Sequence, residues 1–336
     1  MHRQTMINSG KSAQATEAGS RSKKLKSVLS YCIAMYRNAL GWSGIILMTA
    51  ATGFWAFWGT IEAFHEGWCR PDLSERLMQT LFYLLPSLVL GSMSAICIAS
   101  PRSGSIVCFL SSAALLAWVI FEQATFSWFI LLTLIGIPFL FGLLFWFGEV
   151  KPKRWAFLIS IGLPFLLIIA CGIEPVIRVS NRFDDGERGL RNIEGNGVTL
   201  VWAPAGPGWS RDGKVTWQDA TERVRFLSED GSQLMEQPQN IWRLPTRKEI
   251  VCSLTRANAN AGGHWDTSVE NANYRMTPDK ESPIWDPLAP LIYLWTSESA
   301  SDDRAWIVVY HGGVYAKPKN MGSPSLGFRA VRPPSD

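Results

Sequence analysis

The sequence predicts a membrane α-helical bundle of about five transmembrane helices, followed by an α+β domain. Three observations lead to this fold class. Long apolar runs with few charges follow one another from Trp42 to Ile173, and Lys and Arg gather in alternate segments between these runs. From Glu174 onward, charged residues, Gly, Pro and Asn are spread evenly and the apolar runs are short. The two parts therefore meet near residue 174.

The apolar runs are long enough to cross a bilayer, whose hydrocarbon core of about 30 Å takes roughly 20 residues of helix. Five stretches satisfy this requirement: about 42–61, 77–99, 104–121, 127–147 and 156–173. Internal prolines do not exclude helices there, because neighbouring helices can satisfy the carbonyls that a proline leaves free. We therefore expect residues 42–173 to form a five-helix transmembrane region.

The basic residues indicate the orientation, because cytoplasmic loops carry an excess of Lys and Arg. The N-terminal segment, the second loop and the fourth loop together hold Arg3, Lys11, Arg21, Lys23, Lys24, Lys26, Arg37, Arg102, Lys151, Lys153 and Arg154. The loops on the opposite side hold Arg70 and Arg76. This asymmetry places the N-terminus in the cytoplasm, and an odd number of crossings places the C-terminal domain outside it.

Residues 1–41 are expected to be a basic cytoplasmic tail, disordered over residues 1–20 because these are small and polar. Between Leu25 and Leu40 the apolar residues mark one face of a helix, with basic residues near it. This pattern suits an amphipathic helix on an anionic inner leaflet. A plain extension of the first crossing explains it equally well, and both interpretations stay open.

After a charged connector at residues 174–194, a separate domain is expected over residues 195–336. Residues 198–203 are predicted as a strand and 217–228 as a helix opened by Thr216, with Asp219 three residues on. A second helix begins after Thr246, where Glu249 completes a capping box, so we expect Glu249 to cap the helix rather than act as an acid. Short strands follow an irregular stretch at 256–290; they are predicted at 292–297, 304–310, 314–317 and 327–332.

Several motifs of this domain stand in the order of a known family. They are Trp217-Gln218-Asp219-Ala220, Trp242-Arg243-Leu244-Pro245-Thr246 with Glu249, Leu294-Trp295-Thr296-Ser297-Glu298, Ala305-Trp306 and Gly327-Phe328-Arg329-Ala330-Val331-Arg332. Over about residues 195–333 they resemble the Lcl-type domain of bacterial surface proteins, itself similar to the formylglycine-generating (sulfatase-modifying) family. The resemblance implies a C-type-lectin-like fold in which these motif residues are structural. Family members often place cysteines where Val224 and Ala330 stand, so one disulfide is lost here.

The resemblance does not imply an enzymatic activity or a bound metal for this chain. Formylglycine-generating enzymes use a cysteine pair to bind copper, whereas this domain contains Cys252 alone. Cys252 could form a disulfide with Cys69 in an oxidising compartment, but nothing in the sequence requires this bond. Some lectin-like domains bind calcium in their long loop, where this chain has Asn271, Asn273, Asp279, Glu281 and Asp286. Without the family's calcium-binding tripeptides, these residues are read as solvated loop positions, and calcium is a weaker alternative to no cofactor.

The candidate binding residues surround the predicted hairpin at His311-Gly312-Gly313, whose glycines suit a tight turn. They are Asp302, Asp303, Arg304, His311 and Tyr315. We expect them to form one exposed tip, because Arg and aromatic groups are enriched at binding hot spots.

The resulting hypothesis is a multi-pass protein of the bacterial cytoplasmic (inner) membrane, whose outer domain binds a cell-envelope protein or glycan. The helices could also be an interface with a membrane-protein partner. The alternatives are a cell-envelope modifying enzyme and a sequence-diversified receptor. Nucleic acid is not expected as a partner, because the C-terminal part carries 19 Lys and Arg against 21 Asp and Glu.

The distribution of Lys and Arg makes the orientation testable. Alkaline phosphatase, which is active only outside the cytoplasm, is expected to be active when fused after Arg332. A reporter that works in the cytoplasm is expected to be silent at the same junction. The reverse pair of results would contradict the helix number or the orientation.

Overall fold

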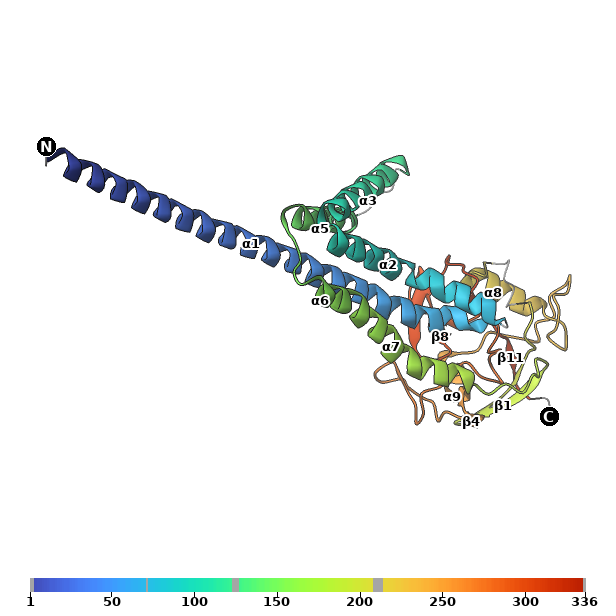
Figure 1. The fold of residues 1–336 in the computed structure, drawn as a ribbon. Helices are drawn as coiled ribbons and strands as arrows, with labels where there is room; N and C mark the ends of the chain where they lie inside the picture. The colour runs from blue at the N-terminus through green and yellow to red at the C-terminus, as the bar shows by residue number, and fades with distance from the viewer. Residues whose placement is uncertain (1–2, 71, 123–126, 208–213, 335–336) are drawn as a thin grey trace. The chain divides into compact units, whose positions relative to one another are not determined.

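The computed structural model describes residues 3–70, 72–122, 127–207 and 214–334. The chain divides into two compact units. One unit comprises Met1–Thr60 with Tyr83–Cys171, and the other comprises Ile61–Phe82 with Gly172–Asp336. Helices fill the first half of the chain, and strands begin after residue 190 (Figure 1).

The helical elements follow one another with short connections. They are α1 Arg3–Glu66, η1 Gly67–Cys69, α2 Leu73–Ala99, α3 Pro101–Phe121, α4 Trp128–Leu131, η2 Leu132–Gly136, α5 Ile137–Phe147, α6 Lys153–Phe157, η3 Leu158–Gly162 and α7 Leu163–Ser180. The segments η2 and η3 are π-helical turns inside otherwise α-helical stretches. Each of the five expected transmembrane stretches coincides with helix.

Four helices in the described part of the chain are long and apolar enough to cross a membrane, and they indicate membrane association. They are Leu25–His65, Leu73–Ala99, Pro101–Phe121 and Lys153–Ser180. At the remaining expected stretch, 127–147, the apolar helix Leu132–Phe147 is shorter than a full crossing, although α4, η2 and α5 follow one another directly.

The N-terminal segment differs from the expected disordered tail, since α1 is helical from Arg3 onward. Ala, Gln, Glu, Lys and Arg are good helix formers, and no proline interrupts the segment. The continuity of α1 through residues 25–40 agrees with an extension of the first crossing.

Small residues allow close packing between helices in the first unit. A Cβ atom on Gly104 of α3 would lie 2.5 Å from the Cα atom of Cys97 in α2. Ser105 donates a hydrogen bond of 2.6 Å to the carbonyl oxygen of Gly142, which joins α3 to α5. Small residues and hydroxyl groups at helix contacts are typical of membrane bundles, in which burial of apolar surface gives little driving force.

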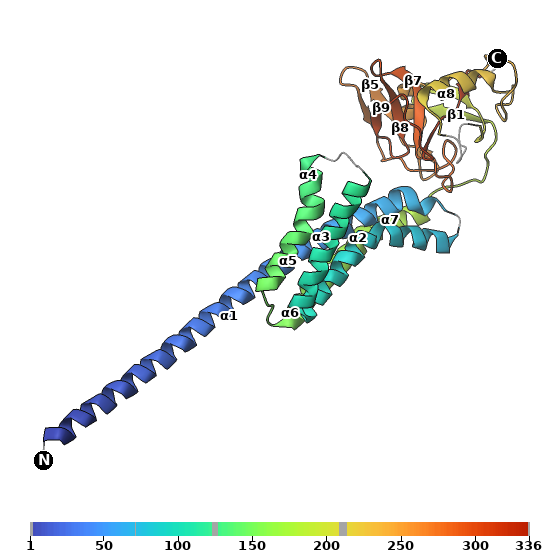
Figure 2. The same cartoon turned by 90° about the horizontal axis from the view of Figure 1, so that it is seen from above.

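The second unit contains two main sheets. In the first, β1 Arg191–Gly195, β2 Val198–Trp202 and β11 Val331–Arg332 pair antiparallel in that order. The second has the order β10 Leu326–Gly327, β7 Tyr293–Ser299, β8 Arg304–Val309 and β9 Val314–Pro318, and β7, β8 and β9 lie side by side (Figure 2). Short hairpins and helices complete the unit: β3 Thr255–Arg256 with β4 Ala259–Asn260, β5 His264–Asp266 with β6 Asn271–Asn273, α8 Trp217–Arg223, η4 Val224–Phe226 and α9 Arg247–Ser253.

The α+β prediction for this part agrees with the structure, with differences at particular elements. β1 begins inside the expected connector and ends at Gly195, because its residues pair with β2 across a turn that contains Gly197 with φ of 80°. The strand expected at 327–332 is divided into β10 and β11, which belong to different sheets. β10 also pairs parallel with β7, so the second sheet is mixed rather than antiparallel.

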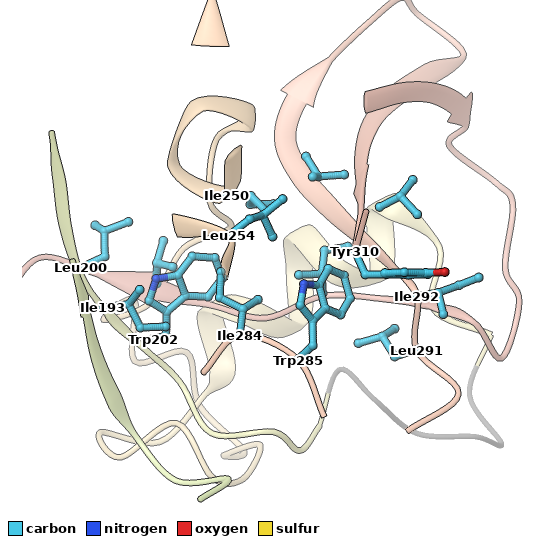
Figure 3. Packing of buried hydrophobic residues seen from close by; sticks show 14 residues of the cluster. Ile193, Leu200, Trp202, Ile250, Leu254, Ile284, Trp285, Leu291, Ile292 and Tyr310 are labelled. Atoms are coloured by element: carbon cyan, nitrogen blue, oxygen red, sulfur yellow. The ribbon is translucent and has the colours of Figure 1, made fainter. Parts of the chain in front are cut away.

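Two buried apolar clusters hold the unit together. In the first, Trp202 lies beside Ile193 and Ile284, and Trp285 lies between Ile284 and Tyr310 (Figure 3). The second cluster surrounds Trp242, Trp295 and Phe328. It also contains Val224 and Ala330, the two positions at which the resembled family often has a disulfide. Apolar packing therefore joins the elements that a covalent bond would otherwise connect.

The motif residues contact the backbone of neighbouring elements. Trp242 donates to the carbonyl of Ser228 at 2.8 Å, and Trp295 donates to that of Val215 at 3.0 Å. Arg329 is buried and donates to the carbonyls of Ala203, Pro283 and Ile284. Leu244, Pro245, Gly327 and Phe328 are also buried.

A capping box begins each of α8 and α9, as the sequence predicts. The Thr246 hydroxyl accepts from the backbone N–H of Glu249 at 3.2 Å, and the Glu249 carboxylate accepts from the N–H of Thr246 at 2.8 Å. Arg243 fixes the same carboxylate with two hydrogen bonds of 2.6 and 2.8 Å. Burial alone would raise the pKa of Glu249, but Arg243 and the Thr246 N–H hold it below its usual range. Glu249 is therefore an ionised cap.

The cap makes a prediction about stability. Replacing Thr246 with Ala removes the acceptor at the start of α9 and is expected to lower the free energy of unfolding by about 1 kcal/mol. Thr221→Ala is the control, because Thr221 is exposed and its hydroxyl bonds the carbonyl of Trp217 within the same helix. Thermal unfolding of the full chain in detergent, followed by tryptophan fluorescence, measures both. An equal effect of the two changes would contradict the capping role.

Candidate functional site

The structure separates the candidate binding residues into two groups. In the β8–β9 hairpin, Arg304 pairs with Pro318 and Val308 pairs with Val314. Asp302, Asp303 and Arg304 therefore lie at the start of β8, whereas His311 lies in the turn that follows its end. A strand rises about 3.3 Å per residue, so the two ends are roughly 20 Å apart. The five residues do not form one tip.

The Asp302 end is an exposed turn with local hydrogen bonds. Ser301 donates from its hydroxyl to the Asp303 carboxylate at 2.6 Å and holds the pKa of that group below its usual range. Lys319 donates its backbone N–H to the carbonyl of Asp303 at 2.8 Å and its ammonium to the carbonyl of Asp302 at 3.1 Å. Arg304 donates to the carbonyl of Ala316. These contacts stabilise the turn.

The other end carries His311 and Tyr315 close together around Gly313. A Cβ atom on Gly313 would lie 2.7 Å from the Tyr315 ring and 2.8 Å from the His311 ring. Gly312 has φ of 89°, as a tight turn requires, and its carbonyl accepts from the Tyr274 hydroxyl at 3.0 Å. Tyr315 is exposed, whereas His311 is half-buried because it lines a cavity.

This cavity, of about 700 Å³, lies wholly within the second unit. Residues from the last turns of α1, from α7 and from the strand-rich part line it. They are Ile61, Phe64, His65, Glu174, Pro175, Arg178, Arg256, Met276, Thr277, Pro278, Tyr310 and His311. Its volume is that of a site for a small ligand. Of the candidate binding residues, His311 alone contributes to it.

Imidazole and phenol groups form one wall of the cavity. His65 Nδ1 lies 3.3 Å from the Tyr310 hydroxyl, and His65 Nε2 lies 3.3 Å from the Tyr293 hydroxyl. The rings of His65 and His311 are 6.0 Å apart. Burial lowers the pKa of His311, so this imidazole is neutral at pH 7. The wall offers hydrogen-bonding groups and carries little charge of its own.

The charge of the cavity comes from arginines around Asp279. This carboxylate is fully buried and accepts from Arg178 at 3.1 Å, from Arg182 at 3.2 Å and from Arg256 at 2.9 Å. Burial alone would raise the pKa of Asp279, but Arg182 and Arg178 outweigh it and hold the pKa below its usual range. Arg178 also pairs with Glu174 at 3.3 Å.

This arrangement corrects the interpretation of the acidic residues as solvated loop positions. Asp279 and Glu281 are buried, and Asp286 pairs with Arg188 at 3.1 Å. Asn271 and Asn273, in contrast, are exposed on β6. No local pattern indicates this burial, because Arg178 and Arg182 lie about 100 residues before Asp279. Arginines contact both oxygens of Asp279, so positive charge already surrounds this carboxylate.

The cysteine chemistry of the unit is limited. Cys69 and Cys252 are buried free thiols and are not joined to each other. Burial raises the pKa of the Cys252 thiol, which disfavours the thiolate that a nucleophile or a copper ligand needs. Among the described residues, no group of three or more His, Cys, Asp or Glu side chains is placed to hold a metal ion.

Comparisons with protein-family models, with curated proteins and with solved structures find no match to this chain.

The burial of Asp279 makes a prediction about stability and pH. Asp279→Asn leaves the three arginines without their shared counter-charge and is expected to cost about 3 kcal/mol at pH 7, measured by denaturant unfolding. Asp303→Asn, at an exposed position, is the control and is expected to leave the unfolding curve close to that of wild type.

The pH dependence has a definite sign. Because the folded-state pKa of Asp279 is lowered, its ionised form stabilises the fold above the usual Asp pKa near 4. That stabilisation is lost as the pH falls through the lowered folded-state value. The wild-type chain is therefore expected to lose more stability than Asp279→Asn below about pH 5. Parallel profiles for the two proteins would contradict the assignment.

Proposed function

We propose that this chain is a membrane-anchored binding or sensing protein and that its ligand site is the cavity lined by His65, Arg178, Arg256 and His311. The observation that carries the proposal is the composition of the cavity wall. Residues from the ends of two candidate membrane-crossing helices and from the strand-rich part meet around one space. A ligand in that space would contact all three segments.

The composition of the wall supports binding rather than catalysis. The arginines are fixed by the buried Asp279 carboxylate, and the His65 imidazole is held between two tyrosine hydroxyls. Such fixed groups lower the ordering cost of binding. A ligand would also bridge α1, α7 and the strand-rich part, so its binding energy could shift the equilibrium between arrangements of these segments. That linkage is what a sensor requires.

The proposal includes the membrane arrangement expected from the sequence. Five crossings, with Trp128–Phe147 as the fourth, would leave the cavity on the side opposite to the basic N-terminal segment. In a bacterial inner membrane this side is the periplasm or the cell exterior. The motifs of residues 195–333 support a lectin-like domain, and a cell-envelope component is the corresponding ligand.

Photocrosslinking in native membranes tests the site. Benzoylphenylalanine in place of Met276, which lines the cavity, is expected to give a ligand adduct detectable by mass spectrometry. The same group in place of Val269, which is 65% exposed and outside the cavity, is the control. Adducts of equal yield and mass at the two positions, or none at Met276, would contradict the proposal.

A further inference from the structure

The charges around the cavity favour a negative ligand. Arg178 and Arg256 line the cavity, and Arg182 lies behind them with a side chain that is 5% exposed. Two carboxylates, Asp279 and Glu174, face these three guanidinium groups. One positive charge is left in excess, and the neutral His311 imidazole does not change this sum.

The geometry of the arginines suits an oxyanion. Arg256 contacts Asp279 through Nη1, and Arg178 uses Nη1 for Asp279 and Nε for Glu174. A guanidinium has five N–H donors in a rigid plane, so each side chain keeps further donors. The side chains of Arg178 and Arg256 are 24% and 30% exposed, which leaves part of each group accessible from the cavity. Arginine donors of this kind bind phosphate and carboxylate in pairs.

The rest of the lining favours an apolar portion in the same ligand. Ile61, Phe64, Met276 and Pro278 contribute apolar side chains to the wall. Ile61 and Phe64 lie in the last turns of the candidate crossing that ends at His65, and Arg178 lies near the end of the one that ends at Ser180. Ends of crossing helices lie at the depth of lipid head groups. An anionic group next to an apolar body is the chemistry of a lipid at this depth.

We propose that the cavity binds a phosphate-bearing amphiphile, with its phosphate at Arg178 and Arg256 and its apolar part against Ile61, Phe64 and Met276. This inference rests on the proposed function, because it names the ligand class of the same cavity. It identifies the phosphate of a lipid, rather than free phosphate, as the group that the arginines bind.

Equilibrium binding to the full chain in a neutral detergent tests the ligand class. The probes are dioctanoyl phosphatidic acid, dioctanoylglycerol with the same chains but no phosphate, and inorganic phosphate. Phosphatidic acid is expected to bind at least about tenfold more tightly than either of the others, because it alone supplies both parts. Equal binding of dioctanoylglycerol would overturn the anionic contact, and equal binding of inorganic phosphate would overturn the apolar contact.

Matched arginine variants test the residues. Arg256→Gln is expected to weaken phosphatidic acid binding at least about tenfold, and Arg256→Lys, which keeps the charge but not the planar fork, by a smaller factor. Arg225→Gln removes an exposed arginine that bonds Asn240 and lies outside the cavity lining, and it is expected to bind within about threefold of wild type. Unchanged binding by Arg256→Gln, or an equal loss in Arg225→Gln, would overturn the assignment.

Photocrosslinking separates this inference from the proposed function. A specific adduct at Met276 without preferential phosphatidic acid binding would leave the cavity as a ligand site and reject the phosphate-bearing amphiphile. Absence of any specific adduct at Met276 would reject the site itself.

Discussion

The buried carboxylate of Asp279 imposes the strongest constraint on the second unit. A fully buried charge is costly unless it is paired and hydrogen-bonded, and three guanidinium groups supply these partners. They come from the end of α7, from the residues directly after it and from β3, so the carboxylate joins the end of α7 to β3. The same contacts hold Arg178 and Arg256 at the cavity. Stability and the proposed binding chemistry therefore depend on one interaction.

A second buried ionisable group, Arg329, holds other segments of the unit together. Arg329 meets carbonyl oxygens rather than a carboxylate, and burial lowers its pKa to about 9. Its contacts connect the end of β2 and residues 283–284 with the turn before β11. The Gly-Phe-Arg motif thus joins these segments through hydrogen bonds from the Arg329 side chain to backbone carbonyls. Together with the apolar contacts of Val224 and Ala330, it explains how the unit holds together without a disulfide at these positions.

The position of the cavity changes the interpretation of the hairpin. Its glycine turn presents His311 toward the cavity, while the Asp302 end forms a separate, locally stabilised turn. A ligand that occupied the cavity would contact helix ends as well as strands, as a protein that senses its membrane surroundings would require. The aromatic Tyr315 remains exposed beside this site and is available to contact a larger ligand.

The sequence by itself determined those elements of the structure that local rules control. The length of the apolar runs predicts the long helices, and the spacing of Thr246 and Glu249 predicts where α9 begins. The glycines after His311 predict the turn of the β8–β9 hairpin. Only the tertiary structure decided the site. Arg178 meets Asp279 across 101 residues and His65 meets Tyr310 across 245, and no local pattern records such contacts. The pairing of β8 with β9 likewise places Asp302 and His311 at opposite ends of the hairpin, although they are close in sequence.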